Sequence, residues 1–190
     1  MKRSTITMAM VLMAALFCGI AAAQEQKPAG ETPVEMGAPA EMKQVDFMIG
    51  IWDVTIQYRM SPEAEWMQAT ATNTNNMILD GCVLESTFEG QMGGMPMQGI
   101  SMTTYNRGLK MWQEMWTDNF GMGISLYTGG FADGKWIFAG ADVSADGDTI
   151  LSRVTSYNIT DTKYDWMMEN STDNGQTWFT SMEMTYTKRQ

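Results

Sequence analysis

Hydrophobic and polar residues alternate with a period of two over most of the chain after residue 50. In the first such run Trp52, Val54, Ile56 and Tyr58 fall on one face, and the residues between them are polar. This alternation is typical of a strand with one buried face. Similar runs predict nine more strands, at residues 65–79, 82–91, 97–106, 109–118, 122–131, 135–143, 149–160, 163–171 and 177–188.

Turn-forming pairs separate these runs. Asp80-Gly81, Gly93-Gly94, Asp133-Gly134 and Asp146-Gly147 each stand between two predicted strands. Connections this short join neighbouring antiparallel strands rather than parallel ones. The pattern therefore predicts an all-β fold, either a sandwich or an up-and-down barrel. We expect the barrel, with about ten strands, because a closed meander leaves no exposed strand edge.

The N-terminal part of the chain has a different character. Lys2 and Arg3 precede an apolar run that ends in three alanines, which is the pattern of a secretory signal peptide over residues 1–23. We therefore expect an exported protein, either periplasmic or secreted. Residues 24–41 contain three prolines and few large apolar side chains, and this predicts a disordered linker. A short helical turn at 41–47 then opens the β-barrel domain, residues 42–190.

The net negative charge of the chain argues against anionic binding partners. The chain has 22 acidic and 12 basic residues, a net charge of −10, and removal of residues 1–23 with their two basic residues makes it −12. Such a charge repels phosphate backbones and anionic lipid head groups, so we expect neither nucleic-acid binding nor docking on a membrane surface. The N-terminal apolar run is too short to favour a membrane span. Cys82 is the single cysteine after residue 23, so no intramolecular disulfide is expected.

The chain contains no histidine. This excludes Ser-His-Asp and Cys-His catalysis, histidine-ligated zinc and haem with a proximal histidine. We therefore expect no cofactor and assign no catalytic residue. Glu114 and Asp118 share a strand face, as do Glu85 and Glu89, but residues four apart on a strand lie about 13 Å from each other. That exceeds the roughly 5–5.5 Å of a retaining glycosidase pair, and only carboxylates on different strands remain as an enzymatic alternative.

Methionine is unusually frequent, with 21 residues in the chain. Met92, Met95 and Met97 lie close together around a Gly-Gly turn, and thioether sulfur is a ligand that suits Cu(I). A periplasmic Cu(I)-handling protein is therefore one alternative. The other interpretation is that these methionines fill gaps in the core, as methionine does elsewhere.

Five short segments resemble the uncharacterised bacterial family called domain of unknown function 1579. They are Phe47–Trp52, Ile78–Gly81, Thr104–Asn106, Trp116–Asp118 and Thr185–Arg189. The resemblance covers residues 42–189 and implies a lipocalin-like (calycin) barrel, with no activity assigned. In such barrels a Gly-x-Trp on the first strand packs against a base from the last strand. It therefore implies that Trp52 and Arg189 close one end of the barrel.

A barrel of this size can enclose one small ligand. We predict that the lining is aromatic, formed by Trp52, Tyr58, Tyr105, Trp112 and Trp116. The leading hypothesis is an exported binding module that holds an apolar or amphipathic small molecule. Besides the copper alternative, an envelope interaction protein without a ligand and with an unspecified protein partner is consistent with the same pattern.

Overall fold

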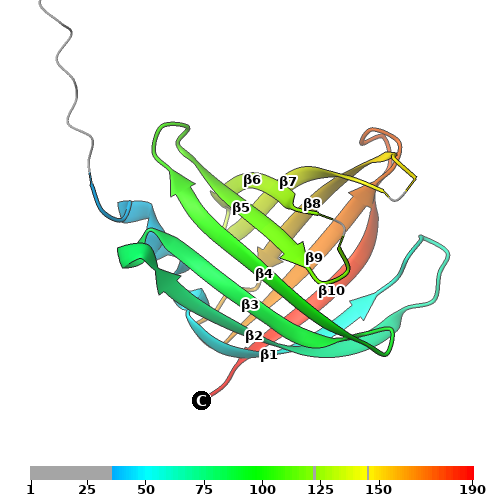
Figure 1. The fold of residues 1–190 in the computed structure, drawn as a ribbon, viewed down its shortest axis with the longest axis horizontal. Coiled ribbons are helices and arrows are strands. Elements are labelled where there is room, and N and C mark those ends of the chain that lie inside the picture. Colours follow the sequence, from blue (N-terminus) through cyan, green and yellow to red (C-terminus); the bar gives the residue numbers. More distant parts are fainter. Residues whose placement is uncertain (1–35, 122, 145) are drawn as a thin grey trace, which may run out of the picture. The chain divides into compact units, whose positions relative to one another are not determined.

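The computed structural model describes residues 36–121, 123–144 and 146–190 (Figure 1). The strands in these residues form one closed antiparallel barrel, which confirms the predicted fold class. Two 3₁₀ helices accompany it, η1 (Ala40–Met48) and η2 (Leu79–Gly81). The strands are β1 (Gly50–Tyr58), β2 (Met67–Ile78), β3 (Val83–Met92), β4 (Met95–Asn106), β5 (Met111–Asp118), β6 (Ser125–Ala132), β7 (Lys135–Val143), β8 (Thr149–Tyr157), β9 (Lys163–Ser171) and β10 (Phe179–Lys188).

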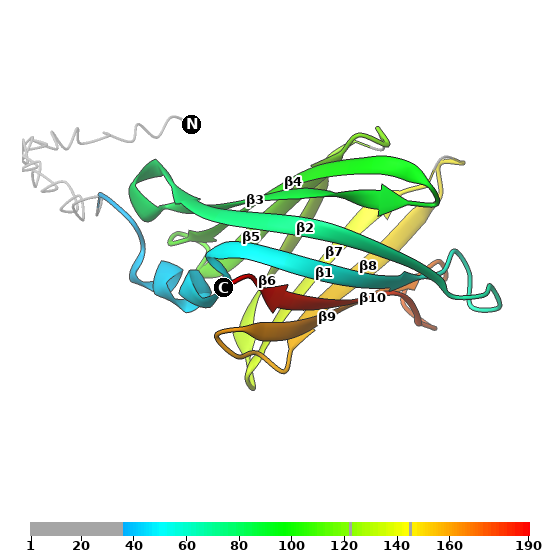
Figure 2. The same cartoon turned by 90° about the horizontal axis from the view of Figure 1, so that it is seen from below.

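The barrel is a simple meander. Each strand pairs with the next one in the sequence, and β10 pairs with β1 to close the ring, with Trp52 opposite Lys188 (Figures 1 and 2). Alternating burial along the strands follows from this closure, because every second side chain points inward. On β1 the buried residues are those of the predicted apolar face, Trp52, Val54, Ile56 and Tyr58.

Turn chemistry sets the strand ends. Gly93 and Gly94 both have positive φ (60° and 81°), and they form a two-residue turn that pairs Met92 with Met95. β4 therefore begins at Met95, two residues before the predicted start. At the next turn the Leu109 N–H donates to Asn106 Oδ1 at 3.0 Å, which holds residues 107–110 out of the sheet. β5 therefore begins at Met111 rather than at residue 109.

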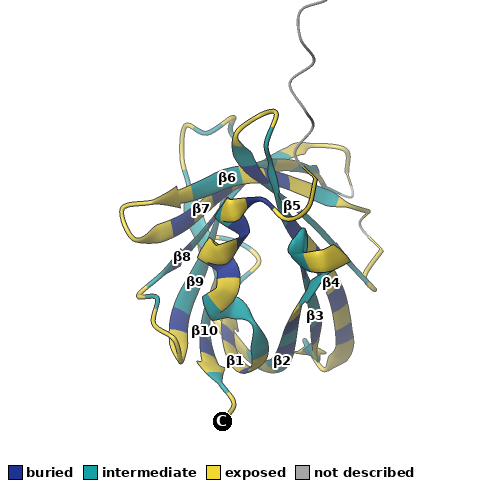
Figure 3. Cartoon of the chain, turned by 90° about the vertical axis from the view of Figure 1, so that its left-hand side faces the viewer, coloured by how far each residue is buried: buried dark blue, intermediate teal, exposed yellow. Residues whose placement is uncertain are grey.

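Helix η1 lies across one end of the barrel (Figure 3). Its Met42 and Val45 are buried against the barrel interior. The Met48 carbonyl accepts hydrogen bonds from Trp52 Nε1 at 2.7 Å and from Asn75 Nδ2 at 2.8 Å. Two buried donors on β1 and β2 thus fix the end of η1, and this end of the barrel is called the closed end below.

The core consists of two clusters of buried side chains. The first contains Trp112, Trp136 and Phe138 and packs under η1. The second contains Trp52, Phe88, Tyr164 and Tyr186 and lies along β1, β3, β9 and β10. Residues of both clusters face the same interior space.

The predicted signal peptide, residues 1–23, and residues 24–35 of the predicted linker lie outside the described residues. Export therefore stays a prediction from the sequence. In the part of the chain that the structure describes, no helix has the length and apolarity needed to cross a membrane.

Candidate functional site

The barrel encloses a cavity of about 300 Å³. Val45 and Met48 of η1 line it at the closed end, and Asp118 and Phe120 line it at the other end, which is called the mouth below. Most of the wall is apolar or aromatic. The Asn, Ser, Thr, Asp and Glu side chains in it come from five strands, and the ones used below besides Asp118 are Asn73, Ser86, Ser101, Thr103, Glu114 and Ser156.

The cavity exists because several inward positions carry small side chains. Ser101 on β4 and Ser156 on β8 are buried, 8% and 5% exposed, where large apolar residues would otherwise fill the barrel. Ser86 on β3 donates its hydroxyl to Asn75 Oδ1, so its small side chain is also held against the wall. Native interiors are packed as densely as organic crystals, so a space of this size at the centre of a small barrel requires such a set of small residues.

Trp116 forms a large part of the wall near the mouth. Its ring lies over Gly99 of the neighbouring strand β4, and it meets Phe88 edge to face, with ring centroids 6.0 Å apart. Its Nε1 donates to Asp118 Oδ2 at 3.0 Å, and Asp118 Oδ1 accepts from the Phe120 N–H at 2.9 Å. The carboxylate of Asp118 is therefore hydrogen-bonded within the protein, and it holds Trp116 and Phe120 in place at the mouth.

Tyr164 and Tyr186 form the opposite wall. Their rings stack with centroids 4.3 Å apart and an angle of 11° between planes. Burial raises the pKa of both phenols, and the nearby Glu114 carboxylate raises both pKa values further. Both tyrosines are therefore neutral at physiological pH, and both line the cavity. The Tyr186 hydroxyl donates to Met184 Sδ at 3.3 Å.

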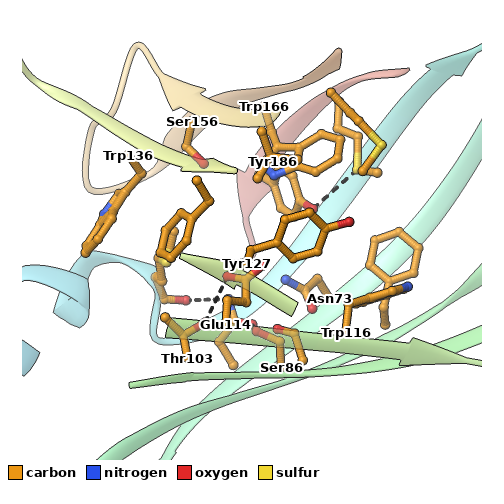
Figure 4. Close-up of a pocket in the computed structure, with 18 of the residues that line it drawn as sticks. Asn73, Ser86, Thr103, Glu114, Trp116, Tyr127, Trp136, Ser156, Trp166 and Tyr186 are labelled. Atoms are coloured by element: carbon orange, nitrogen blue, oxygen red, sulfur yellow. Dashed lines mark hydrogen bonds between the residues drawn. The ribbon is translucent and has the colours of Figure 1, made fainter. Parts of the chain in front are cut away.

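Glu114 lies at the cavity inside the barrel (Figure 4), and along β5 it stands between Trp112 and Trp116 in sequence. Thr103 Oγ1 donates to Glu114 Oε2 at 2.9 Å. The side chain is enclosed by the barrel, and its free surface faces the cavity. Burial raises the pKa of Glu114, and the hydrogen bond from Thr103 acts in the opposite direction. The cavity thus contains a carboxyl group that is hard to ionise without a partner.

Two buried polar atoms among the described residues have no hydrogen-bond partner. They are Asn73 Oδ1 and Trp136 Nε1, and both side chains line the cavity. An unpaired buried polar atom costs free energy, and such atoms are rare in folded proteins. An acceptor and a donor without a partner in the protein thus belong to side chains of the cavity wall.

Of the five aromatic residues predicted to line the interior, one lines the cavity and four lie elsewhere. Trp116 lines the cavity. Trp52 is fully buried behind the wall at the closed end, and Tyr58 is packed into the second cluster near the mouth. Trp112 lies between Tyr105 and Trp136, with ring centroids 5.6 Å and 4.6 Å away. These four side chains support the wall, and they are not among the residues that line the cavity.

The cation beside Trp52 at the closed end is Lys188. Its Nζ lies 5.2 Å from the centroid of the Trp52 ring and donates to the Phe47 carbonyl at 3.4 Å. Arg189, which the family resemblance placed against Trp52, instead donates from Nε to Asp53 Oδ1 at 2.8 Å on the outside of the barrel. The reason is strand parity, because Lys188 is the residue paired with Trp52 and Arg189 follows the end of β10.

The three methionines of the copper alternative are not grouped together around the cavity. Met92 and Met97 line it, whereas Met95 stands at the hairpin tip with 57% of its surface exposed. The other methionines in the lining are Met48, Met168, Met182 and Met184. Among the described residues, no group of three His, Cys, Asp or Glu side chains is placed to hold a metal ion.

Sequence reasoning did not assign a ligand-facing role to Asn73, Glu114, Tyr164 or Tyr186. A signal for Glu114 was present, because it shares a strand face with Trp112 and Trp116 and must point to the same side of the sheet. For Asn73 the sequence carries no comparable signal, since a polar residue on a strand is usually taken to face solvent. Its inward position follows only from the pairing with Trp52 on β1.

We expect Glu114→Gln to raise the free energy of unfolding at neutral pH, by on the order of 1 kcal/mol, and to leave it unchanged in acid. The pKa of Glu114 is raised above its ordinary value of 4.5 in the folded protein. Between those two values the native state binds more protons than the unfolded state, so this residue lowers stability as pH rises. Gln has the same shape and does not titrate.

Urea denaturation at about pH 3 and about pH 8 measures this difference, since these conditions bracket the ordinary carboxyl range and leave tyrosine neutral. Glu89→Gln is the matched control, because Glu89 is exposed on the outer face of β3. As an exposed substitution it should change stability by less than about 0.5 kcal/mol. A loss of stability in Glu114→Gln at neutral pH would contradict the expectation.

Known proteins share this architecture. Residues 38–188 match the family described as "Protein of unknown function (DUF1579)". The S-type phycobiliprotein lyase CPES from Guillardia theta has a TM-score of 0.53 at 9% identity, over 78% of this chain and 92% of the lyase chain. Rv2717c from M. tuberculosis has a TM-score of 0.58 at 8% identity, over 80% and 99% of the two chains. No curated protein matches the chain significantly.

Proposed function

The chain belongs to this family of proteins of unknown function, and we propose that its barrel binds one small, mostly apolar molecule in the interior cavity. The two structural relatives are below 10% identical, so they show the fold alone and do not carry the proposal. The observation that carries it is the cavity itself, of about 300 Å³, with apolar and aromatic walls and a few inward polar groups.

Its volume limits the size of the ligand. A cavity of 300 Å³ stands at the lower end of the range of ligand pockets and equals the share of roughly ten water molecules in the liquid. Mostly apolar walls hold water weakly, so a compact organic molecule that displaces this water gains free energy from the burial of its apolar surface. The polar groups in the wall would then fix its orientation.

The proposal is tested by replacing a small residue of the cavity wall with a large one. Ser101→Phe places a ring in the interior from the middle of β4, and it should weaken the binding of the neutral fluorophore N-phenylnaphthylamine by about tenfold or more, since apolar burial supplies most of such binding. Binding is measured as the rise in probe fluorescence on titration. Met102→Phe is the matched control, because Met102 is the next residue on β4 and points outward, 39% exposed.

The outcome separates two explanations of probe binding. If Ser101→Phe and Met102→Phe both bind the probe like the wild type, the probe sits on the outer surface and the proposed interior site is wrong. If Ser101→Phe alone loses binding and still unfolds cooperatively in urea, the probe occupies the cavity.

A further inference from the structure

The side chains in the cavity wall that can carry a full charge at neutral pH are acidic. Among the described residues that line it, the carboxyl groups of Glu114 and Asp118 are present, while no Lys or Arg side chain is. Histidine is absent from the whole chain. A ligand with a carboxylate or phosphate would therefore meet an acidic interior without a cation to pair with, and burial of such an unpaired charge is costly.

The two carboxyl groups differ in how far the protein satisfies them. Asp118 accepts from Trp116 Nε1 and from the Phe120 N–H, one donor for each of its oxygens. Glu114 accepts one hydrogen bond, from Thr103, at Oε2. An ionised carboxylate offers about four acceptor sites on its two oxygens. Glu114 therefore has unused acceptor capacity, and its free surface faces the cavity.

A second acceptor belongs to Asn73, whose side chain also lines the cavity. Asn73 is 6% exposed, and its Oδ1 is one of the two buried polar atoms without a partner in the described chain. The charge of Glu114 and a hydrogen bond from the side chain of Asn73 both influence the pKa of Tyr164, so both side chains lie close to that tyrosine. Figure 4 shows Asn73 and Glu114 on the same side of the cavity, beneath the ring of Tyr127.

We propose, as an extension of the proposed function, that the ligand is a compact aromatic or apolar amine whose protonated nitrogen binds Glu114 and Asn73. An ammonium group has donors and no acceptor, so one such group can satisfy both Glu114 and Asn73 Oδ1. A ligand carbonyl would need a protonated Glu114, and it would leave Asn73 Oδ1 without a donor. The aromatic faces of Trp116, Tyr127 and Tyr186 in the wall also attract a cation.

Three probes with the same ring test the charge preference. Tryptamine is cationic at neutral pH, skatole is neutral, and indolepropionate is anionic. Titration calorimetry on the purified protein at neutral pH should show tryptamine binding about tenfold or more tightly than skatole, because a hydrogen bond to a charged group contributes about 1.5–3 kcal/mol. Indolepropionate should bind more weakly than skatole.

The decisive variant is Glu114→Gln. We expect it to lose the preference for tryptamine, with a fall in affinity of about tenfold or more, and to keep its affinity for skatole. Because Gln retains the shape of the side chain, unchanged skatole binding shows that the cavity is intact. Glu89→Gln removes an exposed carboxylate from the outer face of β3 and should leave all three affinities unchanged.

The results distinguish this inference from the proposal on which it rests. If skatole binds and tryptamine binds no more tightly, or if Glu114→Gln keeps the tryptamine preference, the amine assignment is wrong while the cavity still binds ligands. If neither skatole nor N-phenylnaphthylamine binds to the wild-type protein, the proposed function fails and the inference fails with it.

Discussion

Replacement of Trp52 by alanine should lower the free energy of unfolding by about 3–5 kcal/mol, the largest change that we expect from a single side chain here. Trp52 is fully buried, and its ring packs edge to face against Tyr164 with centroids 5.0 Å apart. Lys188 covers the ring, and the indole N–H holds the Met48 carbonyl at the end of η1. Alanine would leave a large void and release the attachment of η1 at once.

Chemical denaturation in urea measures this loss, with Trp66→Ala as the control. Trp66 lies in the hairpin between β1 and β2, is 38% exposed, and stacks with Arg59 at 4.6 Å. Its removal should cost less than about 1 kcal/mol. If Trp52→Ala does not fold, Trp52→Phe keeps most of the ring and removes the N–H donor, and it should cost about 1 kcal/mol. Equal losses in Trp52→Ala and Trp66→Ala would show that the closed end does not anchor the fold.

The barrel could be predicted from local patterns because its strands are joined in sequence order. Alternation along Trp52, Val54, Ile56 and Tyr58 identifies the buried face of β1, and short turns require antiparallel neighbours. The strand ends were less predictable, since they depend on particular turn contacts. The hydrogen bond from the Leu109 N–H to Asn106 Oδ1, for example, moves the start of β5 to Met111.

The site was predicted only in part, because alternation tells which face a residue occupies and not how far along the barrel it lies. Trp52 and Trp116 both point inward, yet Trp52 is packed under η1 and Trp116 faces open space. The difference comes from what stands opposite each ring. Small residues such as Ser101 and Ser156 leave space inside the barrel, and their effect appears only when the register of all strands is known.

The ligand-facing roles of Glu114 and Asn73 were not predicted because they depend on contacts between strands. Glu114 was considered together with Asp118 as an acid pair along β5, and their separation along the strand argued against catalysis. The partners that give Glu114 its character come from other strands. Thr103 lies on β4, Asn73 on β2 and Tyr164 on β9, and a closed barrel brings them to one interior.

Gly99→Ala should lower the free energy of unfolding by about 1–3 kcal/mol and weaken the binding of N-phenylnaphthylamine. A Cβ at position 99 would overlap the six-membered ring of Trp116, which lies directly over the glycine. The backbone of Gly99 does not have positive φ, so alanine is otherwise acceptable in the strand. The ring of Trp116 is the part that can move, and movement away from β4 takes it into the cavity.

A double-mutant cycle with Trp116→Leu separates this cause from others. In the Trp116→Leu background the overlap is gone, and Gly99→Ala should be neutral or should stabilise the protein by roughly 0.5–1 kcal/mol, because alanine suits a strand better than glycine. The coupling energy between the two positions should therefore reach about 1–3 kcal/mol. If Gly99→Ala costs the same in both backgrounds, then the sheet needs glycine for its backbone. A large coupling shows instead that glycine is required by the ring across from it, so that one missing side chain on β4 fixes the position of the Trp116 wall of the cavity.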